Sequence, residues 1–234
     1  MAGLVSSLIT VNVLINIEPM SRAPKPPRPT LTDEAIATAL LPFKVHVTPG
    51  LASSIRKYID LLLLWNHKVN LTSITDPEEI LRRHFGESMF AAHSVFIETG
   101  RLADVGSGAG FPGLALKLLA PDLEVFLIES VMKKATFLLE VVRHLNLTGV
   151  KVVVSRFQDL RDTLAPLDFI CARALGDHQQ LLDWAKYNVN IGGQVVLWLG
   201  AEDAKHVTAL SDWAWREPIA IPESLRRSLL VGTL

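Results

Sequence analysis

A glycine-rich segment after a short apolar run is the part of this chain best suited to bind a ligand. The apolar run ends at Val105, and Gly106, Gly108, Gly110 and Gly113 follow it before a run of good helix formers. A strand, a glycine loop and a helix start, in this order, bring backbone N–H groups close to a bound ligand. Glycine suits such a loop because it adopts positive φ without steric cost and has no side chain to block close approach.

Acidic residues at the ends of two predicted strands indicate which cofactor the loop binds. Residues 108–113 match the dinucleotide-binding pattern G-x-G-x-x-G, which is a weak signal by itself. Asp104 lies at the strand end before the loop, where its charge repels a pyrophosphate and suits the ammonium and sulfonium groups of S-adenosylmethionine. Glu129, which ends the next apolar run, is placed like the acidic residue that hydrogen-bonds a ribose. The sequence therefore favours S-adenosylmethionine over NAD, and either of them over a tight turn that binds nothing.

Two later segments are expected to face the same crevice, because the carboxyl ends of parallel strands share one edge of the sheet. Phe157 is placed to lie against an adenine ring, while Gln158 or the neighbouring backbone reads the edge of that ring. A capped loop with one buried aromatic residue is an equally consistent interpretation of this segment. Arg173 directly follows the fourth predicted strand, and we favour a role in the crevice over a surface ion pair.

The elements that must position these residues are typical of an α/β fold. From residue 101 onward strands are predicted to alternate with helices, which implies a mostly parallel sheet with helices on both faces. Before that point the chain reads as helical, with Thr32 and Asp76 as N-caps and an amphipathic helix over about 49–67. The predicted strands span 101–105, 123–129, 150–154, 167–172 and 193–199, the predicted helices between them span about 112–120, 132–146 and 177–189, and residues 213–234 are expected to add closing strands.

Composition limits the class of protein. The chain has 234 residues, of which 49% are hydrophobic and 20% charged, enough for one α/β domain with an appendage. Its net charge of −1 means that any contact with nucleic acid must come from a local patch. The single cysteine, Cys171, excludes an intrachain disulfide and is expected to be a buried core residue. We find no convincing signal peptide, membrane span or metal-ligand spacing, and expect a cytoplasmic protein.

Four motifs of the sequence resemble those of one known family. They are W-N-x-x-x-N-L-T-S over residues 65–73, Arg83-His84 followed by Ser88, D-V-G-S-G-x-G-x-P-G over 104–113, and Arg173-Ala174. On these motifs the chain is similar to the RsmG family, also called glucose-inhibited division protein B. Its members are bacterial methyltransferases that act on guanine N7 of small-subunit ribosomal RNA. The resemblance covers roughly residues 50–200.

The resemblance implies a seven-stranded, Rossmann-like S-adenosylmethionine-dependent methyltransferase sheet with an N-terminal helical extension. Together with a proline-rich stretch, it divides the chain into an unstructured extension and linker (1–30), a helical N-terminal extension (31–100) and a methyltransferase domain (101–234). The implied partner is 16S ribosomal RNA or the small subunit, and we expect a monomer that does not bind membranes. By matching position, the cofactor contacts are Gly106, Phe111, Phe157, Gln158 and Arg173, with Glu129 at the ribose by the argument above.

Three positions depart from the family pattern. Glu87 stands where the family usually has aspartate, Ala172 replaces a serine that commonly precedes the arginine, and Leu199 replaces a lysine. These changes leave cofactor binding untouched and bear on the acceptor. We expect direct in-line methyl transfer to guanine N7 without a general base, with Arg173 in a positioning role. The alternatives are a small-molecule methyltransferase and a non-catalytic, cofactor-binding module associated with the ribosome.

Overall fold

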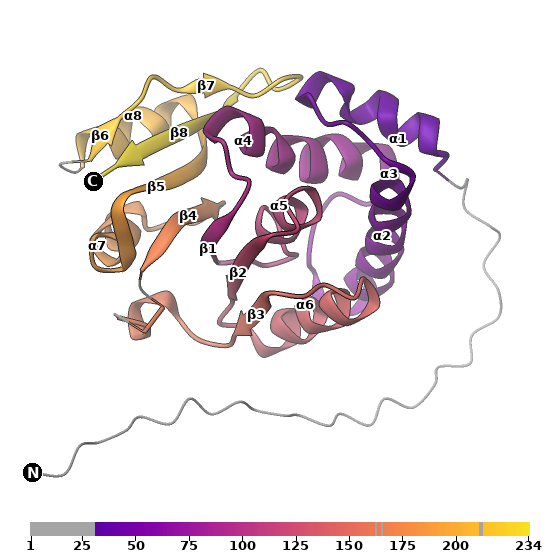
Figure 1. The fold of residues 1–234 in the computed structure, drawn as a ribbon, viewed down its shortest axis with the longest axis horizontal. Coiled ribbons are helices and arrows are strands. Elements are labelled where there is room, and N and C mark those ends of the chain that lie inside the picture. Colours follow the sequence, from indigo (N-terminus) through magenta and orange to yellow (C-terminus); the bar gives the residue numbers. More distant parts are fainter. Residues whose placement is uncertain (1–30, 162, 165, 211–212) are drawn as a thin grey trace, which may run out of the picture. The chain divides into compact units, whose positions relative to one another are not determined.

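The computed structural model describes residues 31–161, 163–164, 166–210 and 213–234. The extension and linker expected over residues 1–30 lie outside this range. The described chain begins with helices and continues as an alternation of strands and helices (Figure 1). Its α-helices are α1 (Asp33–Leu40), α2 (Pro49–Val69), α3 (Pro77–Ile80), α4 (Glu87–Val95), α5 (Gly113–Leu119), α6 (Met132–His144), α7 (His178–Asn188) and α8 (Ala201–Ala209).

The N-terminal helices begin where the sequence predicts them. The side chains of Thr32 and Asp76 accept hydrogen bonds from the N–H groups of Ala35 and Glu79, which confirms both N-caps. Helix α2 buries its apolar stripe and ends at Val69, with Asn70 as its C-cap in the left-handed conformation. In the described part of the chain no helix is both long and apolar enough to cross a membrane.

The helical stretch from α3 to α4 contains a local irregularity that the sequence periodicity does not reveal. Residues Leu81–Gly86 form a π-helical segment between α3 and α4, so the chain stays helical while its side chains change direction. This segment carries Arg83 and His84, two of the residues that support the family resemblance. Such π segments are frequent at functional sites. Helix α8 also has no counterpart among the predicted elements.

The sheet is mostly parallel, as the alternation predicts. Its hydrogen-bonded order is β3-β2-β1-β4-β5-β8-β6, and the two-residue strand β7 pairs with β8 beside this path. The pairs among β1 to β5 are parallel and those made by β8 are antiparallel. The strands are β1 (Gly100–Val105), β2 (Leu123–Ile128), β3 (Val150–Val153), β4 (Leu167–Arg173), β5 (Val189–Gly200), β6 (Ala214–Trp215), β7 (Ile219–Ala220) and β8 (Arg227–Thr233).

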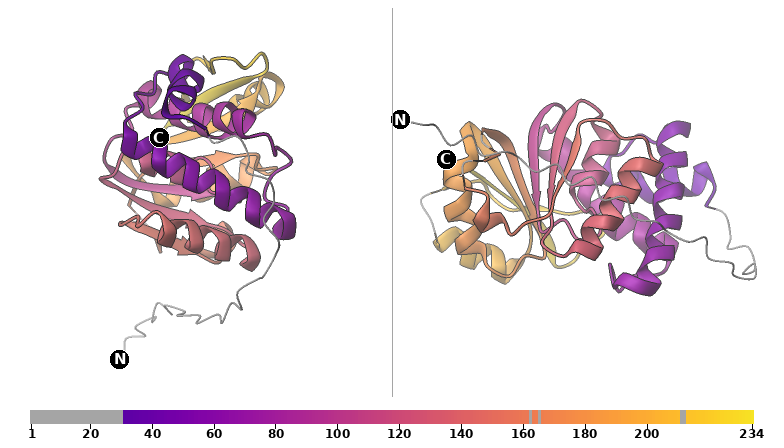
Figure 2. Two further views of the ribbon diagram at one scale, coloured as in Figure 1. Left: turned by 90° about the vertical axis from the view of Figure 1, so that its right-hand side faces the viewer. Right: turned by 90° about the horizontal axis from the view of Figure 1, so that it is seen from below.

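Helices cover both faces of the sheet, so the central strands β1, β2, β4 and β5 are apolar on both sides. Alternate residues of β1 illustrate this: Leu102 belongs to the core shared with α1, α2 and α4 to α6, whereas Ala103 belongs to the core under α7 and α8. The two helical layers are visible when the sheet is seen edge-on (Figure 2, right). Cys171 is a fully buried free thiol, which confirms the sequence prediction.

Candidate functional site

The predicted ligand-binding segments meet at the carboxyl edge of the parallel strands. The glycine loop follows β1, Glu129 follows β2, and Arg173 ends β4, and β1 pairs in parallel with both of these strands. Gly106, Gly108 and Gly110 have φ between 55° and 86°, in the left-handed region that favours glycine. The loop therefore has the backbone conformation expected of a ligand cradle.

Gly113 has a different role from the other three glycines, because its lack of a side chain lets its backbone approach Asp104 closely. A Cβ at this position would lie 2.8 Å from Asp104 Oδ2 and 2.7 Å from Leu127 Cδ2. Its absence lets the Gly113 N–H donate a 2.9 Å hydrogen bond to Asp104 Oδ2. This bond fixes the carboxylate at the start of α5, where the helix N-terminus favours negative charge.

Asp104 retains an unused acceptor. The residue is fully buried, and its Oδ1 atom has no hydrogen-bond partner among the described residues. Burial raises the pKa of this carboxyl from 3.8 to about 7, against the opposing effects of the Gly113 N–H and the Ser107 hydroxyl. A buried oxygen without a donor is costly unless something binds it. A cationic donor such as an ammonium group would satisfy this oxygen.

Glu129 fixes the shape of the same loop. Its Oε2 accepts from the Gly108 N–H at 2.9 Å, and its Oε1 accepts from the Val131 N–H at 2.7 Å. The side chain is 5% exposed. An ionised carboxylate has about four acceptor positions, so two remain for the hydroxyls of a ribose.

The helical N-terminal segment packs against the glycine loop. Phe111 stacks on Tyr58 of α2, with ring centroids 5.2 Å apart, and on His84, with centroids 4.9 Å apart. The Tyr58 hydroxyl donates to the Ala109 carbonyl. Phe111 is 7% exposed, so its side chain anchors the loop in the core while its backbone stays part of the cradle.

His84 connects this aromatic cluster to the W-N-x-x-x-N-L-T-S motif. Its Nε2 lies 2.8 Å from Thr72 Oγ1. The loop that carries Thr72 is held by Asn66, whose Oδ1 accepts from the Leu71 and Thr72 N–H groups and whose Nδ2 donates to the Thr72 carbonyl. Burial, followed by the charges of Arg173 and other arginines, lowers the pKa of His84 to about 3. His84 is therefore neutral at physiological pH. Its ring stacks on Phe111 and forms a hydrogen bond with Thr72.

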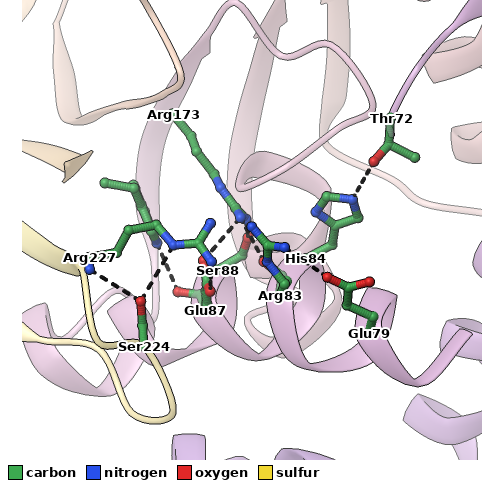
Figure 3. A network of polar contacts seen from close by, with 10 residues as sticks. Thr72, Glu79, Arg83, His84, Glu87, Ser88, Arg173, Ser224 and Arg227 are labelled. Atoms are coloured by element: carbon green, nitrogen blue, oxygen red, sulfur yellow. Dashed lines mark hydrogen bonds and ion pairs between the residues drawn. The ribbon is translucent and has the colours of Figure 1, made fainter. Parts of the chain in front are cut away.

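Arg173 is embedded in a polar network (Figure 3). Its Nη2 donates to the Arg83 carbonyl at 2.7 Å and pairs with Glu87 Oε2 at 3.0 Å. The Arg173 side chain is 12% exposed and the Glu87 side chain 3% exposed. Burial lowers the pKa of Arg173 to about 10, so the guanidinium stays charged at neutral pH. The guanidinium is thus a fixed positive charge at the end of β4.

The segment after β3 places its two predicted residues differently from each other. Phe157 is 8% exposed and packs edge-on against Trp184, with centroids 5.8 Å apart. Gln158 is exposed and donates from Nε2 to Gln180 Oε1 at 2.8 Å. The Phe157 ring therefore packs into the core under α7, and contact of Phe157 and Gln158 with a cofactor stays a prediction.

Three residues of the site escape the sequence reasoning. Tyr58 lies in the predicted amphipathic helix and Thr72 in the W-N-x-x-x-N-L-T-S motif, but the sequence does not show what either side chain contacts. Arg227 pairs with Glu87 from the start of β8, and the sequence shows it only as one of two arginines before an apolar run. Leu199, which replaces the family lysine, is 5% exposed and lies in the core beneath α7 and α8.

Within the residues that the structure describes, no group of three His, Cys, Asp or Glu side chains is arranged to hold a metal ion. Together, the glycine loop, the two buried carboxylates and the Arg173 guanidinium lie at one edge of the sheet. The pKa of His84, the histidine beside this loop, is lowered to about 3, so its imidazole is a very weak base near neutral pH.

Comparison with known proteins gives results consistent with this geometry. The family described as GidB, rRNA small subunit methyltransferase G, matches residues 51–217. A Ribosomal RNA small subunit methyltransferase G from Desulfitobacterium hafniense is 40% identical over 64% of this chain, and the match spans 63% of that relative's length. One from Roseiflexus castenholzii is 42% identical over 70% of this chain and 69% of its own.

A solved structure shows the same fold. The crystal structure of a SAM dependent methyltransferase from Aquifex aeolicus superposes with a TM-score of 0.57, covering 70% of this chain and 96% of its own, at 16% sequence identity. The sheet with helices on both faces is therefore the Rossmann-like arrangement that the sequence predicts.

Proposed function

Because the chain belongs to the GidB family of rRNA small subunit methyltransferase G, we propose that it methylates guanine N7 in 16S ribosomal RNA. S-adenosylmethionine is the cofactor of this family. The observation that carries the proposal is the buried, unpartnered Oδ1 of Asp104 at the edge of a glycine cradle. A family match identifies the class of reaction, and this atom supports the proposal that the chain binds the cofactor at this loop.

The residues present fit S-adenosylmethionine. Asp104 Oδ1 offers a buried acceptor to its ammonium group, and Glu129 keeps acceptor positions for its ribose. The backbone of the glycine loop and of residues 157–158 lies at the edge where the remainder would bind. When bound, S-adenosylmethionine supplies an electrophilic methyl group that a nucleophile displaces in line from the thioether.

Guanine N7 is an acceptor that suits a site without a general base. Its lone pair lies in the plane of the ring and carries no proton near neutral pH, so no proton has to leave before attack. The pKa of His84 is lowered to about 3, which makes it a very weak base, Arg173 stays charged, and Glu87 is paired with two arginines, so none of the three suits the role of a general base. The contribution of the chain is therefore to position the acceptor and to exclude water.

The direct test is methyl transfer from labelled cofactor to naked 16S RNA, to small ribosomal subunits and to a pool of small molecules. Reduction and aniline cleavage, which cut RNA at 7-methylguanosine, then locate the product. We expect label in RNA and a single cleavage site. Label that resists this cleavage would contradict the N7 acceptor. Label found only in small molecules would support a small-molecule methyltransferase, the alternative favoured by Leu199 in place of the family lysine and by the near-neutral net charge of −1.

A further inference from the structure

Glu87 is a buried carboxylate that joins two arginines from distant parts of the chain. Its Oε2 pairs with Arg173 Nη2 at 3.0 Å, and its Oε1 pairs with Arg227 Nη2 at 2.6 Å. The two arginines come from the end of β4 and the start of β8 (Figure 3). Each oxygen thus serves one guanidinium, and the carboxylate cannot rotate without losing both pairs.

Glu87 and Arg227 are each held by further hydrogen bonds. The Glu87 carbonyl accepts a 2.8 Å hydrogen bond from the Trp198 indole N–H. The Ser224 hydroxyl accepts from the Arg227 backbone N–H at 3.2 Å, and its oxygen lies 3.5 Å from Arg227 Nε. A second ion pair, Arg82 with Glu223 at 3.8 Å, joins the same helical segment to the loop before β8.

Glu87 lies between two like charges, so the loss of one arginine is expected to change its pairing with the other. Arg173 and Arg227 repel each other in a partly dehydrated environment, and Glu87 is the buried counter-ion between them. Without Arg227, Glu87 Oε1 loses its partner and the carboxylate is free to turn both oxygens towards Arg173, because a bidentate pair is the stronger geometry. Arg173 would then move away from its present contacts with the Arg83 carbonyl and Ser88.

We propose that Arg227 is a further positioning residue, which sets the orientation of Arg173 through Glu87. The inference rests on the proposed function, because it assumes that Arg173 positions the reacting groups. Arg227 lies beyond residue 217, where the family match ends.

The test compares Arg227→Gln and Arg227→Lys with Arg226→Gln, a matched control at the exposed neighbouring arginine. Single-turnover rates are measured with saturating RNA and cofactor, and cofactor affinity by calorimetry. We expect Arg227→Gln to slow methyl transfer by about 10- to 100-fold, because a small misplacement of the reacting groups has an effect of this size. Cofactor affinity should stay within about threefold of wild type. Arg227→Lys restores most of the rate, and Arg226→Gln leaves it unchanged.

A double-mutant cycle tests the path through Glu87. If Arg227 acts through this carboxylate, adding Arg227→Gln to Glu87→Gln slows the reaction by less than about twofold, since coupled residues are non-additive. Fully additive effects would overturn the proposal. So would a raised KM for RNA with unchanged kcat in Arg227→Gln, because that pattern marks direct, uniform binding of RNA by Arg227. Thermal unfolding of each variant identifies any that fails to fold.

A readout without turnover separates this inference from the proposed function. The Arg173 Nε–H signal in a nitrogen–proton correlation spectrum, assigned by its loss in Arg173→Lys, is expected to shift in Arg227→Gln and to stay in place in Arg226→Gln. An unchanged signal in Arg227→Gln would overturn the positioning relation even where methyl transfer to RNA is observed. A wild-type protein that methylates no RNA would instead refute the proposed function while this spectral test still stands.

Discussion

The hydroxyl of Tyr58 donates a 2.6 Å hydrogen bond to the backbone carbonyl of Ala109, across 51 residues of sequence. This contact joins the long N-terminal helix α2 to the glycine loop, and the loop leaves no spare room there. A Cβ on Gly110 would lie 2.2 Å from the Tyr58 oxygen. The helical N-terminal segment is therefore part of the cofactor-site scaffold, because it determines where the loop backbone lies.

Tyr58→Phe is expected to lower the free energy of unfolding by about 1–3 kcal/mol, since it leaves the buried Ala109 carbonyl without its donor. It should also weaken cofactor binding, because the loop loses its support. Urea unfolding and calorimetry measure the two effects. The matched control is Tyr187→Phe at the other tyrosine of the chain, whose side chain is 56% exposed. Equal effects of the two substitutions would contradict the supporting role.

A thermal-shift experiment tests the choice of cofactor. S-adenosylmethionine or its demethylated product should raise the melting temperature, and at a hundredfold excess over Kd the stabilisation is about 2.7 kcal/mol. NAD should give no comparable shift, because Asp104 disfavours a pyrophosphate. In Asp104→Asn the shift with S-adenosylmethionine should largely disappear, since a charge-assisted hydrogen bond of about 1.5–3 kcal/mol is lost. Stabilisation by NAD alone would overturn the assignment of the cofactor.

The sequence predicts most of this fold and only part of this site, and the division has a physical basis. Strands, helices and the caps at Thr32 and Asp76 follow from local periodicity and side-chain chemistry, so they can be predicted one segment at a time. Asp104 and Glu129 are predictable because strand ends of a parallel sheet share an edge. The partners of Glu87 are not, because Arg173 and Arg227 reach it from 86 and 140 positions away in the sequence.

The same distinction explains Phe111 and Phe157. Both stay predicted cofactor contacts, and an aromatic residue beside a ligand has the same local sequence pattern as one that anchors its loop in the core. The contacts of these rings with Tyr58 and Trp184 are long-range, so the sequence does not reveal them. The π-helical segment at Leu81–Gly86 is likewise a result of packing, since its residues fit an ordinary helical pattern.

Cofactor affinity is expected to depend on pH through Asp104. Burial raises its pKa from 3.8 to about 7 in the unliganded protein, so the carboxyl is largely protonated at pH 5.5 and ionised at pH 7.5. Only the ionised form pairs with an ammonium group. The Kd for S-adenosylmethionine should therefore fall as pH rises through this window, by up to about tenfold per pH unit below the pKa. In Asp104→Asn the Kd should be weaker and flat, and a parallel slope in both proteins would exclude Asp104 as the titrating group.

The same pKa has the opposite effect on the stability of the unliganded protein. Between about pH 4 and 7 the folded state binds a proton that the unfolded state has released, so the free energy of unfolding falls as pH rises. Asp104→Asn removes this dependence. At pH 8 the variant should be at least as stable as wild type without cofactor, although it binds cofactor more weakly. Calorimetric melting of both proteins at pH 5 and pH 8 measures the difference, and a variant less stable at pH 8 than at pH 5 relative to wild type would contradict it.

The rate of methyl transfer, in contrast, is expected to be independent of pH once cofactor and RNA are saturating. An acceptor that carries no proton needs no base, the pKa of His84 lies at about 3, and that of Arg173 at about 10. Single-turnover rates should therefore be flat from about pH 6.5 to 9. Arg173→Ala should slow the reaction, by about 100-fold where positioning is lost, without changing the shape of the profile. A single-proton rise across this window, abolished by replacing one histidine or carboxylate, would show that the acceptor must lose a proton, as an exocyclic amine or a ribose hydroxyl does.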